Sequence, residues 1–174
     1  MARFAPHATL VRVTKAKKND VERWKEGRHL ETSGRTVEEL VDRAVADRYE
    51  FAIQFFRTAE RAFSDRRPMY RLAVSRYYYS MYHALRAAAY KHHGGDDHEE
   101  HRTLPGKIPD DMPNYALLGN TLKNARERRN AADYEPYPKS NLAWEVDAAD
   151  LRDSARMVLN EVRTYLRAKG CRFI

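Results

Sequence analysis

The chain has 174 residues, 43% of them apolar, and a formal net charge of +7 at pH 7. This length and composition suit one compact domain with a single hydrophobic core. They exclude a helical membrane protein and a disulfide-rich secreted one, because no apolar run approaches the roughly 18 residues of a membrane span and Cys171 is the only cysteine. No secretory signal is recognisable at the N-terminus, so a cytoplasmic protein is expected.

Positive charge is concentrated in residues 1–35. That segment holds nine Lys and Arg residues against four acidic ones, a surplus of five out of the total of +7. We therefore predict a basic N-terminal arm, in which Lys15, Lys17 and Lys18 contact nucleic-acid phosphates. The alternatives are an arm that is basic for solubility, or one that docks on an acidic partner.

Two short elements are predicted inside this arm. The alternation of Thr9–Val13 indicates a strand, and Asp20–Leu30 can form a helix before a turn at Ser33-Gly34. From residue 36 the pattern changes to that of long helices.

The sequence T-V-E-E at residues 36–39 is a capping box, in which the Thr36 hydroxyl and the Glu39 carboxylate accept hydrogen bonds from free backbone amides at a helix start. A first long helix is predicted from here to about Phe63, because apolar residues recur at three- and four-residue steps. A second helix, capped by Ser64 or Asp65, should run to about Lys91. Pro68 would lie in its first turn, where the missing amide costs nothing, and Gly94-Gly95 would end it.

A third helix is predicted to begin at Pro113 and to end before Pro136 and Pro138. Its inward stripe contains a charge among apolar positions: Leu118, Leu122, Ala125, Arg129 and Ala132. A fourth helix ends before Gly170 and carries the stripe Leu151, Ala155, Val158, Leu159, Val162 and Leu166. Four amphipathic helices with mostly short connections predict an all-α, antiparallel four-helix bundle over residues 36–174.

Two segments carry a family resemblance. The second helix contains S-R-Y-Y-Y-S-M-Y-H-A-L at residues 75–85, and the third ends in R-E-R-R-N-A-A-D-Y-E-P-Y at residues 126–137. Together they resemble the HEPN family (higher eukaryotes and prokaryotes nucleotide-binding), over about residues 36–168. The resemblance implies a small helical protein that acts on RNA or nucleotides. Tyr78, Tyr79 and Tyr82 would then pack the bundle and hold polar groups, or contact a base.

The resemblance departs from the family's ribonucleases at one position. In those proteins an arginine, usually followed by a polar residue, is separated by four to six residues from a histidine, and the pair acts without a metal. Here Arg129 and Asn130 are followed by Tyr134, and no histidine occurs after His101. Tyrosine, with a pKa near 10, is a poor base at neutral pH, so proton-transfer catalysis is not expected here. The ending D-Y-E-P-Y-P resembles HEPN subgroups that have lost the histidine, which implies a degenerate motif that does not cleave RNA.

Three alternatives stay open for this segment. Arg128 and Arg129 could acidify Tyr134, or Asp133 could serve as the base. Arg129 could instead form an ion pair with Asp133, four residues along the helix. The segment could also only cap the helix end.

The loop after the second helix is rich in possible metal ligands, namely His92, His93, Asp96, Asp97, His98 and His101. Their spacing matches no known metal motif and the two glycines indicate a solvated turn, so neither a metal nor a cofactor is predicted. A further alternative is that His98 or His101 folds over the third helix and replaces the missing histidine.

The leading hypothesis is a HEPN RNA- or nucleotide-binding module of a toxin–antitoxin or phage-defence system. The resemblance implies a homodimer and a nucleotidyltransferase partner. The alternative is a metal-independent endoribonuclease toxin, and a distant one is a metal-dependent helical-bundle hydrolase. The candidate catalytic residues are Arg129, Asn130, Asp133 and Tyr134. The candidate RNA-binding residues are Arg76, Tyr79, Arg126, Arg128, Lys15, Lys17 and Lys18.

Overall fold

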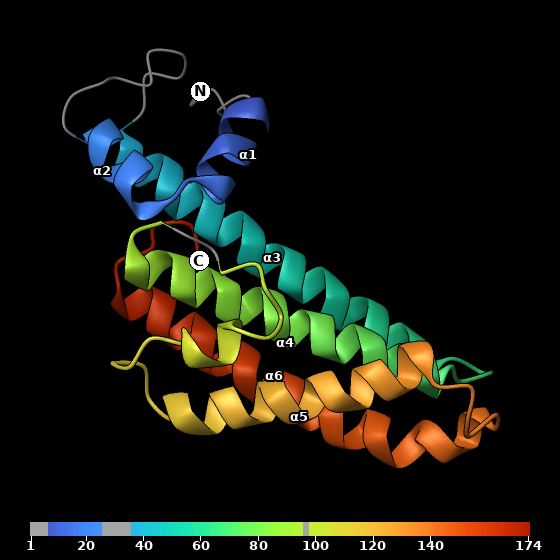
Figure 1. Cartoon of the computed structure of the whole chain (residues 1–174). Coiled ribbons are helices and arrows are strands. Elements are labelled where there is room, and N and C mark those ends of the chain that lie inside the picture. The colour runs from blue at the N-terminus through green and yellow to red at the C-terminus, as the bar shows by residue number, and fades with distance from the viewer. Residues whose placement is uncertain (1–6, 26–35, 96–97) are drawn as a thin grey trace.

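The computed structural model describes residues 7–25, 36–95 and 98–174, and these fold into helices without any strand (Figure 1). The α-helices are α1 (His7–Lys15), α2 (Lys18–Lys25), α3 (Val37–Ser64), α4 (Tyr70–His93), α5 (Tyr115–Tyr134) and α6 (Glu145–Ala168). Two 3₁₀ turns, η1 (Leu104–Gly106) and η2 (Asn141–Trp144), lie in the connections. The all-α prediction is confirmed, and the described residues add two short helices before the four long ones.

The N-terminal region differs from the prediction. Thr9–Val13, predicted as a strand, lies within helix α1, because Leu10 and Val13, three residues apart, share the side that packs on the bundle. The Tyr90 hydroxyl donates a hydrogen bond to the Val13 carbonyl. The predicted short helix is found as α2, which begins at Lys18, while residues 26–30 and the turn at Ser33-Gly34 lie outside the described residues.

Helices α1 and α2 lie against the long helices (Figure 1). Val13 and Val21 are fully buried and belong to the hydrophobic core. A Cβ atom added to Gly95, just after α4, would lie 2.8 Å from the backbone nitrogen of Lys18, so the chain approaches α4 closely there. The predicted domain boundary at residue 35 lies in the undescribed range 26–35 and stays a prediction.

Helix α3 begins where predicted, and the Thr36 hydroxyl accepts a hydrogen bond from the Glu39 amide at 3.2 Å, as in a capping box. The Glu39 carboxylate pairs with Arg172 at 3.4 Å. Helix α4 begins later than predicted, at Tyr70 with Met69 as its N-cap, so Pro68 precedes the helix. Its end agrees with the prediction, because Gly94 adopts the left-handed conformation (φ 68°) and its amide bonds to the Tyr90 carbonyl.

Helix α4 is the centre of the bundle and contacts α3, α5 and α6. Helix α5 begins at Tyr115 after Asn114, two residues later than predicted. The stripes predicted for α5 and α6 are buried throughout, including Arg129. No helix among the described residues is both long enough and apolar enough to cross a membrane.

One ionic cluster joins three helices. The Glu60 carboxylate of α3 accepts two hydrogen bonds of 2.7 Å from Arg152 of α6, one from Arg156 and one of 2.6 Å from the Tyr77 hydroxyl of α4. Burial alone would raise the pKa of Glu60, but these hydrogen bonds outweigh it and lower the pKa to about 2. The cluster fixes α3, α4 and α6 relative to one another.

Candidate functional site

The most unusual side chain in the bundle is that of Arg129, which is only 5% exposed although it carries a charge. Its guanidinium carbon lies 5.0 Å from the ring centre of Tyr78, 5.3 Å from that of Tyr79 and 5.8 Å from that of Tyr134. One terminal nitrogen donates a hydrogen bond of 3.3 Å to the Tyr134 hydroxyl. Three aromatic faces thus surround the cation, which favours its charged form.

The carboxylate nearest to this cation is held at a distance. Asp133 Oδ2 lies 3.8 Å from Arg129 Nε, so the ion pair that the sequence allowed is present but long. The Ser75 hydroxyl donates to the same oxygen at 3.3 Å. Arg129 Nε is buried and has no hydrogen-bond partner among the described residues. A buried guanidinium nitrogen without a partner is costly, and such groups are typical of binding sites.

The loop after α4 brings His101 to this cluster. Its ring stacks on Tyr82 with centroids 4.0 Å apart and planes at 19°. Its Nδ1 lies 2.5 Å from the Tyr78 hydroxyl oxygen, and its backbone carbonyl accepts a hydrogen bond of 3.1 Å from Arg126. Of the two histidines that could replace the missing one, the structure therefore places His101 against the tyrosine that covers Arg129.

The local environment sets three protonation states at neutral pH. Burial, followed by the charges of Arg129, Arg86 and Arg126, lowers the pKa of His101, so the imidazole is neutral. Burial raises the pKa of Tyr78 to about 12 although Arg129 opposes the shift, so the phenol keeps its proton. Burial opposes the charge on Arg129, but the neighbouring tyrosines outweigh it and the pKa of Arg129 is raised.

Some of the remaining residues predicted on α4 and α5 contact Arg129 or its aromatic neighbours, and others are exposed. Tyr79 is part of it, and Arg76 covers the neighbouring Phe55 ring at 5.8 Å. Asn130 and Tyr134 are exposed, Tyr134 at 71%.

Arg128 lies on another side of α5. It pairs with Asp147 at 3.4 Å and with Asp150 at 3.2 Å, both on α6. Arg128 is therefore not part of the cluster around Arg129.

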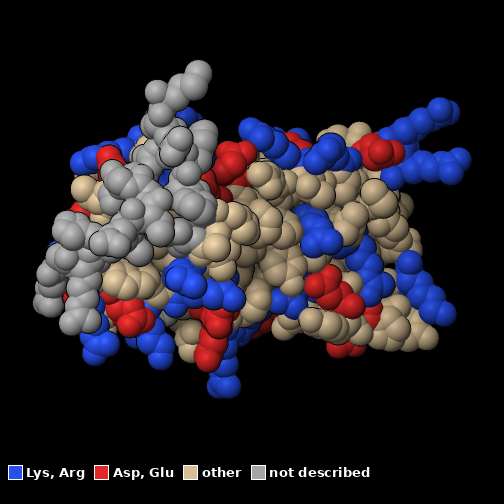
Figure 2. All heavy atoms as spheres, turned by 90° about the horizontal axis from the view of Figure 1, so that it is seen from above, with Lys and Arg blue, Asp and Glu red and all other residues tan. Residues whose placement is uncertain are grey.

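The three predicted lysines are also far from Arg129 along the bundle. Lys15, Lys17 and Lys18 belong to α1, α2 and the link between them, which lie near the C-terminal end of α4 (Figure 1). Ser75, which contacts Asp133, belongs to the N-terminal part of α4. Their predicted contact with phosphates would therefore form a separate site. Basic side chains also gather at the end where α3 passes into α4, where Arg66 and Arg67 are exposed (Figure 2).

The loop histidines do not form one cluster within the described part of the loop. His93 and His98 meet edge to face at 4.9 Å, whereas His101 lies at the tyrosines. His92 instead faces Asp111, with 3.2 Å between Nδ1 and Oδ1. Asp96 and Asp97 lie outside the described residues.

His92, Asp110 and Asp111 offer three ligand atoms within 4.8 Å of one another. Lys169 already pairs with Asp111, and the Tyr165 hydroxyl donates to it at 2.9 Å. An ammonium group thus occupies the place where a cation would neutralise the carboxylate, and the arrangement does not favour a metal.

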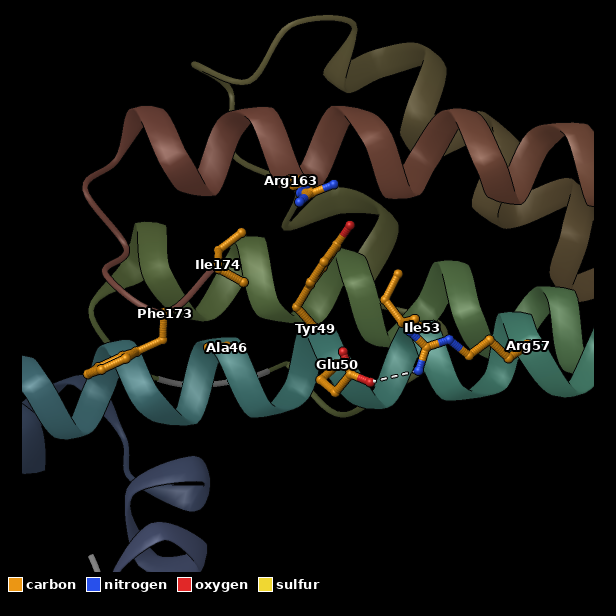
Figure 3. A pocket seen from close by; sticks show the side chains of 8 residues that line it. All are labelled: Ala46, Tyr49, Glu50, Ile53, Arg57, Arg163, Phe173 and Ile174. Atoms are coloured by element: carbon orange, nitrogen blue, oxygen red, sulfur yellow. Dashed lines mark hydrogen bonds and ion pairs between the residues drawn. The ribbon is translucent and has the colours of Figure 1, made fainter. Parts of the chain in front are cut away.

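A pocket of about 270 Å³ lies elsewhere, between α3, α6 and the C-terminal residues (Figure 3). It is lined by Ala46, Tyr49, Glu50, Ile53, Arg57, Arg163, Phe173 and Ile174. None of the residues predicted from the sequence contributes to it. By helical periodicity it lies on the side of α3 opposite to Phe51 and Phe55.

The comparison with protein families agrees with this architecture. Nothing among curated proteins and nothing among solved structures matches the chain. The model of the HEPN domain matches residues 45–165, which run from within α3 to near the end of α6 and include Arg129 and His101. This match covers more than two thirds of the sequence, and the chain belongs to the HEPN domain family.

Proposed function

We propose that the protein is an RNA- or nucleotide-binding HEPN module whose anion-binding residue is Arg129. The observation that carries the proposal is the buried guanidinium with an unsatisfied Nε and a carboxylate no nearer than 3.8 Å. Because this nitrogen is buried, a phosphate oxygen would have to displace the exposed Tyr134 side chain to supply the missing short contact. Charge-assisted hydrogen bonds to phosphate are among the strongest in proteins. The tyrosine rings around it offer faces on which a base can stack.

Membership of the HEPN family also supports a proposal for the biological setting. HEPN modules of toxin–antitoxin and phage-defence systems commonly act with a nucleotidyltransferase encoded beside them, and we propose the same setting here, with a homodimer as the active form. Co-purification of the neighbouring gene product and light scattering of the purified protein test these two points. A monomer that copurifies with nothing would contradict this setting while leaving RNA binding intact.

The binding proposal is tested with fluorescein-labelled single-stranded RNA and with ATP, by anisotropy and calorimetry at a fixed salt concentration. Arg129→Ala should weaken binding about tenfold or more, since it removes charge-assisted contacts. Arg128→Ala is the matched control, because this neighbouring arginine pairs with α6 and should change affinity less than about twofold. Equal affinities for Arg129→Ala and the unchanged protein would exclude Arg129 as the anion-binding residue.

A second candidate function, metal-independent ribonuclease activity, is favoured by the position of His101. Its Nδ1 faces the Tyr78 hydroxyl, and its pKa is lowered. If Nδ1 holds the proton and donates it to the Tyr78 oxygen, Nε2 can remove the proton of a ribose 2′-hydroxyl. That oxygen would attack the adjacent phosphorus and Arg129 would stabilise the growing charge. The bond from phosphorus to the 5′-oxygen would break, and the 5′-oxygen would take a proton from water.

This second function predicts cleavage of labelled RNA in the presence of EDTA, with products ending in a 2′,3′-cyclic phosphate. His101→Ala should abolish cleavage and leave RNA binding within a few-fold. Tyr134→Phe should have little effect, whereas it should abolish cleavage if Tyr134 were the base. Binding without any cleavage would leave the first function standing alone.

A further inference from the structure

Four aromatic rings form a continuous cluster on the side of α3 and α4 next to Arg129. Phe51 and Phe55 of α3 meet edge to face, with centroids 4.8 Å apart and 69° between the planes. Phe55 stacks on His83 at 5.2 Å with 12° between the planes, and on Tyr79 at 5.4 Å with 28°. Tyr79 in turn lies 5.9 Å from the His101 ring and 5.3 Å from the Arg129 guanidinium. We call Phe51, Phe55, Tyr79 and His83 the aromatic ladder.

The two phenylalanines of the ladder, Phe51 and Phe55, lie outside the hydrophobic core. Phe51 is 45% exposed, and neither Phe51 nor Phe55 belongs to the hydrophobic core, which takes Ala52 and Ala59 from the same helix. The two rings pack on α4 side chains that are themselves only partly buried, His83 and Tyr79. A group of large aromatic side chains that is left partly uncovered beside a polar site indicates a binding surface.

Arginine side chains flank the ladder. Arg76 lies over the Phe55 ring at 5.8 Å, and Arg129 lies over Tyr79 at the other side. The helix positions next to the ladder rings, 48 of α3 and 76 of α4, hold arginines. The carboxylates beside this face each pair with an arginine, Asp47 with Arg43 at 3.0 Å and Asp133 with Arg129 at 3.8 Å. Aromatic faces interleaved with arginines are typical of surfaces that bind unpaired nucleic acid, because each base has a face to stack on and each phosphate a charge to meet.

We propose that the aromatic ladder binds the unpaired bases of single-stranded RNA, with Arg76 and Arg129 contacting the phosphates on either side. The proposal rests on the RNA-binding function and names the substrate class as single-stranded. A duplex would not fit, since its bases are stacked on one another and inaccessible to the rings.

A second copy of the chain is a less suitable occupant of this face. In a two-fold symmetric contact the same patch meets itself, so arginines would face arginines, and the carboxylates beside the described patch, Asp47 and Asp133, already pair with Arg43 and Arg129. RNA brings the opposite charge and planar groups of the right size.

The test uses a fluorescein-labelled 12-nucleotide single strand and a blunt duplex of the same length, measured by anisotropy against the full chain. Phe51→Ala should weaken binding of the single strand by roughly five- to tenfold and leave the duplex unaffected. Phe51→Trp should keep the affinity, and its added emission should be quenched when the single strand binds. Phe173→Ala is the control, because Phe173 is similarly exposed at 40% and lines the pocket on the other side of α3.

The outcomes separate the two proposals. If the unchanged protein binds RNA and Arg129→Ala loses it while Phe51→Ala does not, the ladder is refuted and the function stands. An equal loss for single strand and duplex also refutes the ladder. If Phe51→Ala instead converts a dimer into a monomer without changing RNA affinity, the face belongs to a second copy. No binding of RNA by the unchanged protein overturns both proposals.

Discussion

Nδ1 of His101 lies 2.5 Å from the hydroxyl oxygen of Tyr78, a residue 23 positions earlier whose ring covers the Arg129 guanidinium. This contact joins the loop after α4 to the buried charge of α5. Because the Tyr82 ring stacks on the other part of the same imidazole, the histidine is held by a hydrogen bond and a ring contact together. The loop is therefore anchored at the site and not only connected to it by the chain.

His101→Ala should consequently destabilise the fold. The variant loses a partly buried hydrogen bond and an aromatic stack, which together contribute about 1–2 kcal/mol to the free energy of unfolding. Urea denaturation followed by circular dichroism measures this difference. His7→Ala, which removes an exposed histidine from α1, should change the stability by less than about 0.5 kcal/mol. Equal stabilities of the two variants would show that His101 does not dock on the tyrosines.

His83 should make the fold sensitive to mild acid. Burial, followed by the charges of Arg86 and Arg48, lowers the pKa of His83 to about 3, below the 6.5 of an unfolded chain. The unfolded chain therefore binds the proton more readily, and stability falls as the pH drops below 6.5. His83→Phe keeps a ring in the stack and removes the titrating group.

Between pH 7 and pH 5, His83→Phe should lose about 2 kcal/mol less stability than the unchanged protein. Urea denaturation at a series of pH values compares the two curves. His83→Phe should also be more stable than the unchanged protein at pH 7, because Nδ1 of His83 is buried without a hydrogen-bond partner among the described residues. Parallel curves across this range would mean that His83 is hydrated in the folded protein.

The Glu60 carboxylate should affect the stability at lower pH than His83 does, because it is an acid and stabilises the fold in its charged form. Its pKa is lowered to about 2 from an ordinary value of 4.5, so its stabilising effect is complete above pH 4.5 and is lost as the pH falls toward 2. Glu60→Gln should remove this dependence and cost about 2 kcal/mol at neutral pH, after allowance for solvent screening. Glu50→Gln, which breaks an exposed pair with Arg57, is the control and should cost only a few tenths of a kcal/mol. Acid unfolding that is unchanged in Glu60→Gln would contradict the cluster.

The parts of the fold that could be predicted from the sequence are those fixed by local chemistry. The Thr36 cap, the left-handed Gly94 and the charge in the inward stripe of α5 each depend on a few neighbouring residues. The position of His101 could not be predicted in this way, because it follows a glycine-rich turn without periodicity and is fixed by contacts with Tyr78 and Tyr82 on another element. The composition of the segment signalled only that histidines were present.

The prediction of a strand at Thr9–Val13 was wrong for a related reason. Five residues of alternating character fit an extended chain, but two apolar residues three positions apart also fit one side of a helix. The decision is made by distant partners, since Val13 is buried in the bundle and accepts a hydrogen bond from Tyr90, 77 residues away. The aromatic ladder also depends on tertiary structure, because it joins α3 and α4 only once they are packed together.

Substitution of Gly95 tests whether the N-terminal helices pack against the end of α4. Its φ of 133° is almost confined to glycine, and an added Cβ would lie 2.8 Å from the Lys18 nitrogen and 2.9 Å from its Cα. Gly95→Ala should therefore cost about 3 kcal/mol, from backbone strain together with overlap against a backbone that cannot rotate away. Gly94→Ala is the matched control, because Gly94 is also left-handed but has no atom within 4 Å of the added Cβ, and should cost about 1 kcal/mol.

Limited digestion with trypsin distinguishes the consequences of the two substitutions. If α2 is seated on the end of α4, Gly95→Ala displaces it, and cleavage after Lys17 and Lys18 should become faster than in Gly94→Ala. Equal stabilities and equal cleavage rates would mean that the approach of Lys18 to Gly95 does not exist in solution. Residues 7–25 would then form the detached basic arm that their charge predicts, and Lys15, Lys17 and Lys18 would be free to reach RNA bound elsewhere on the bundle.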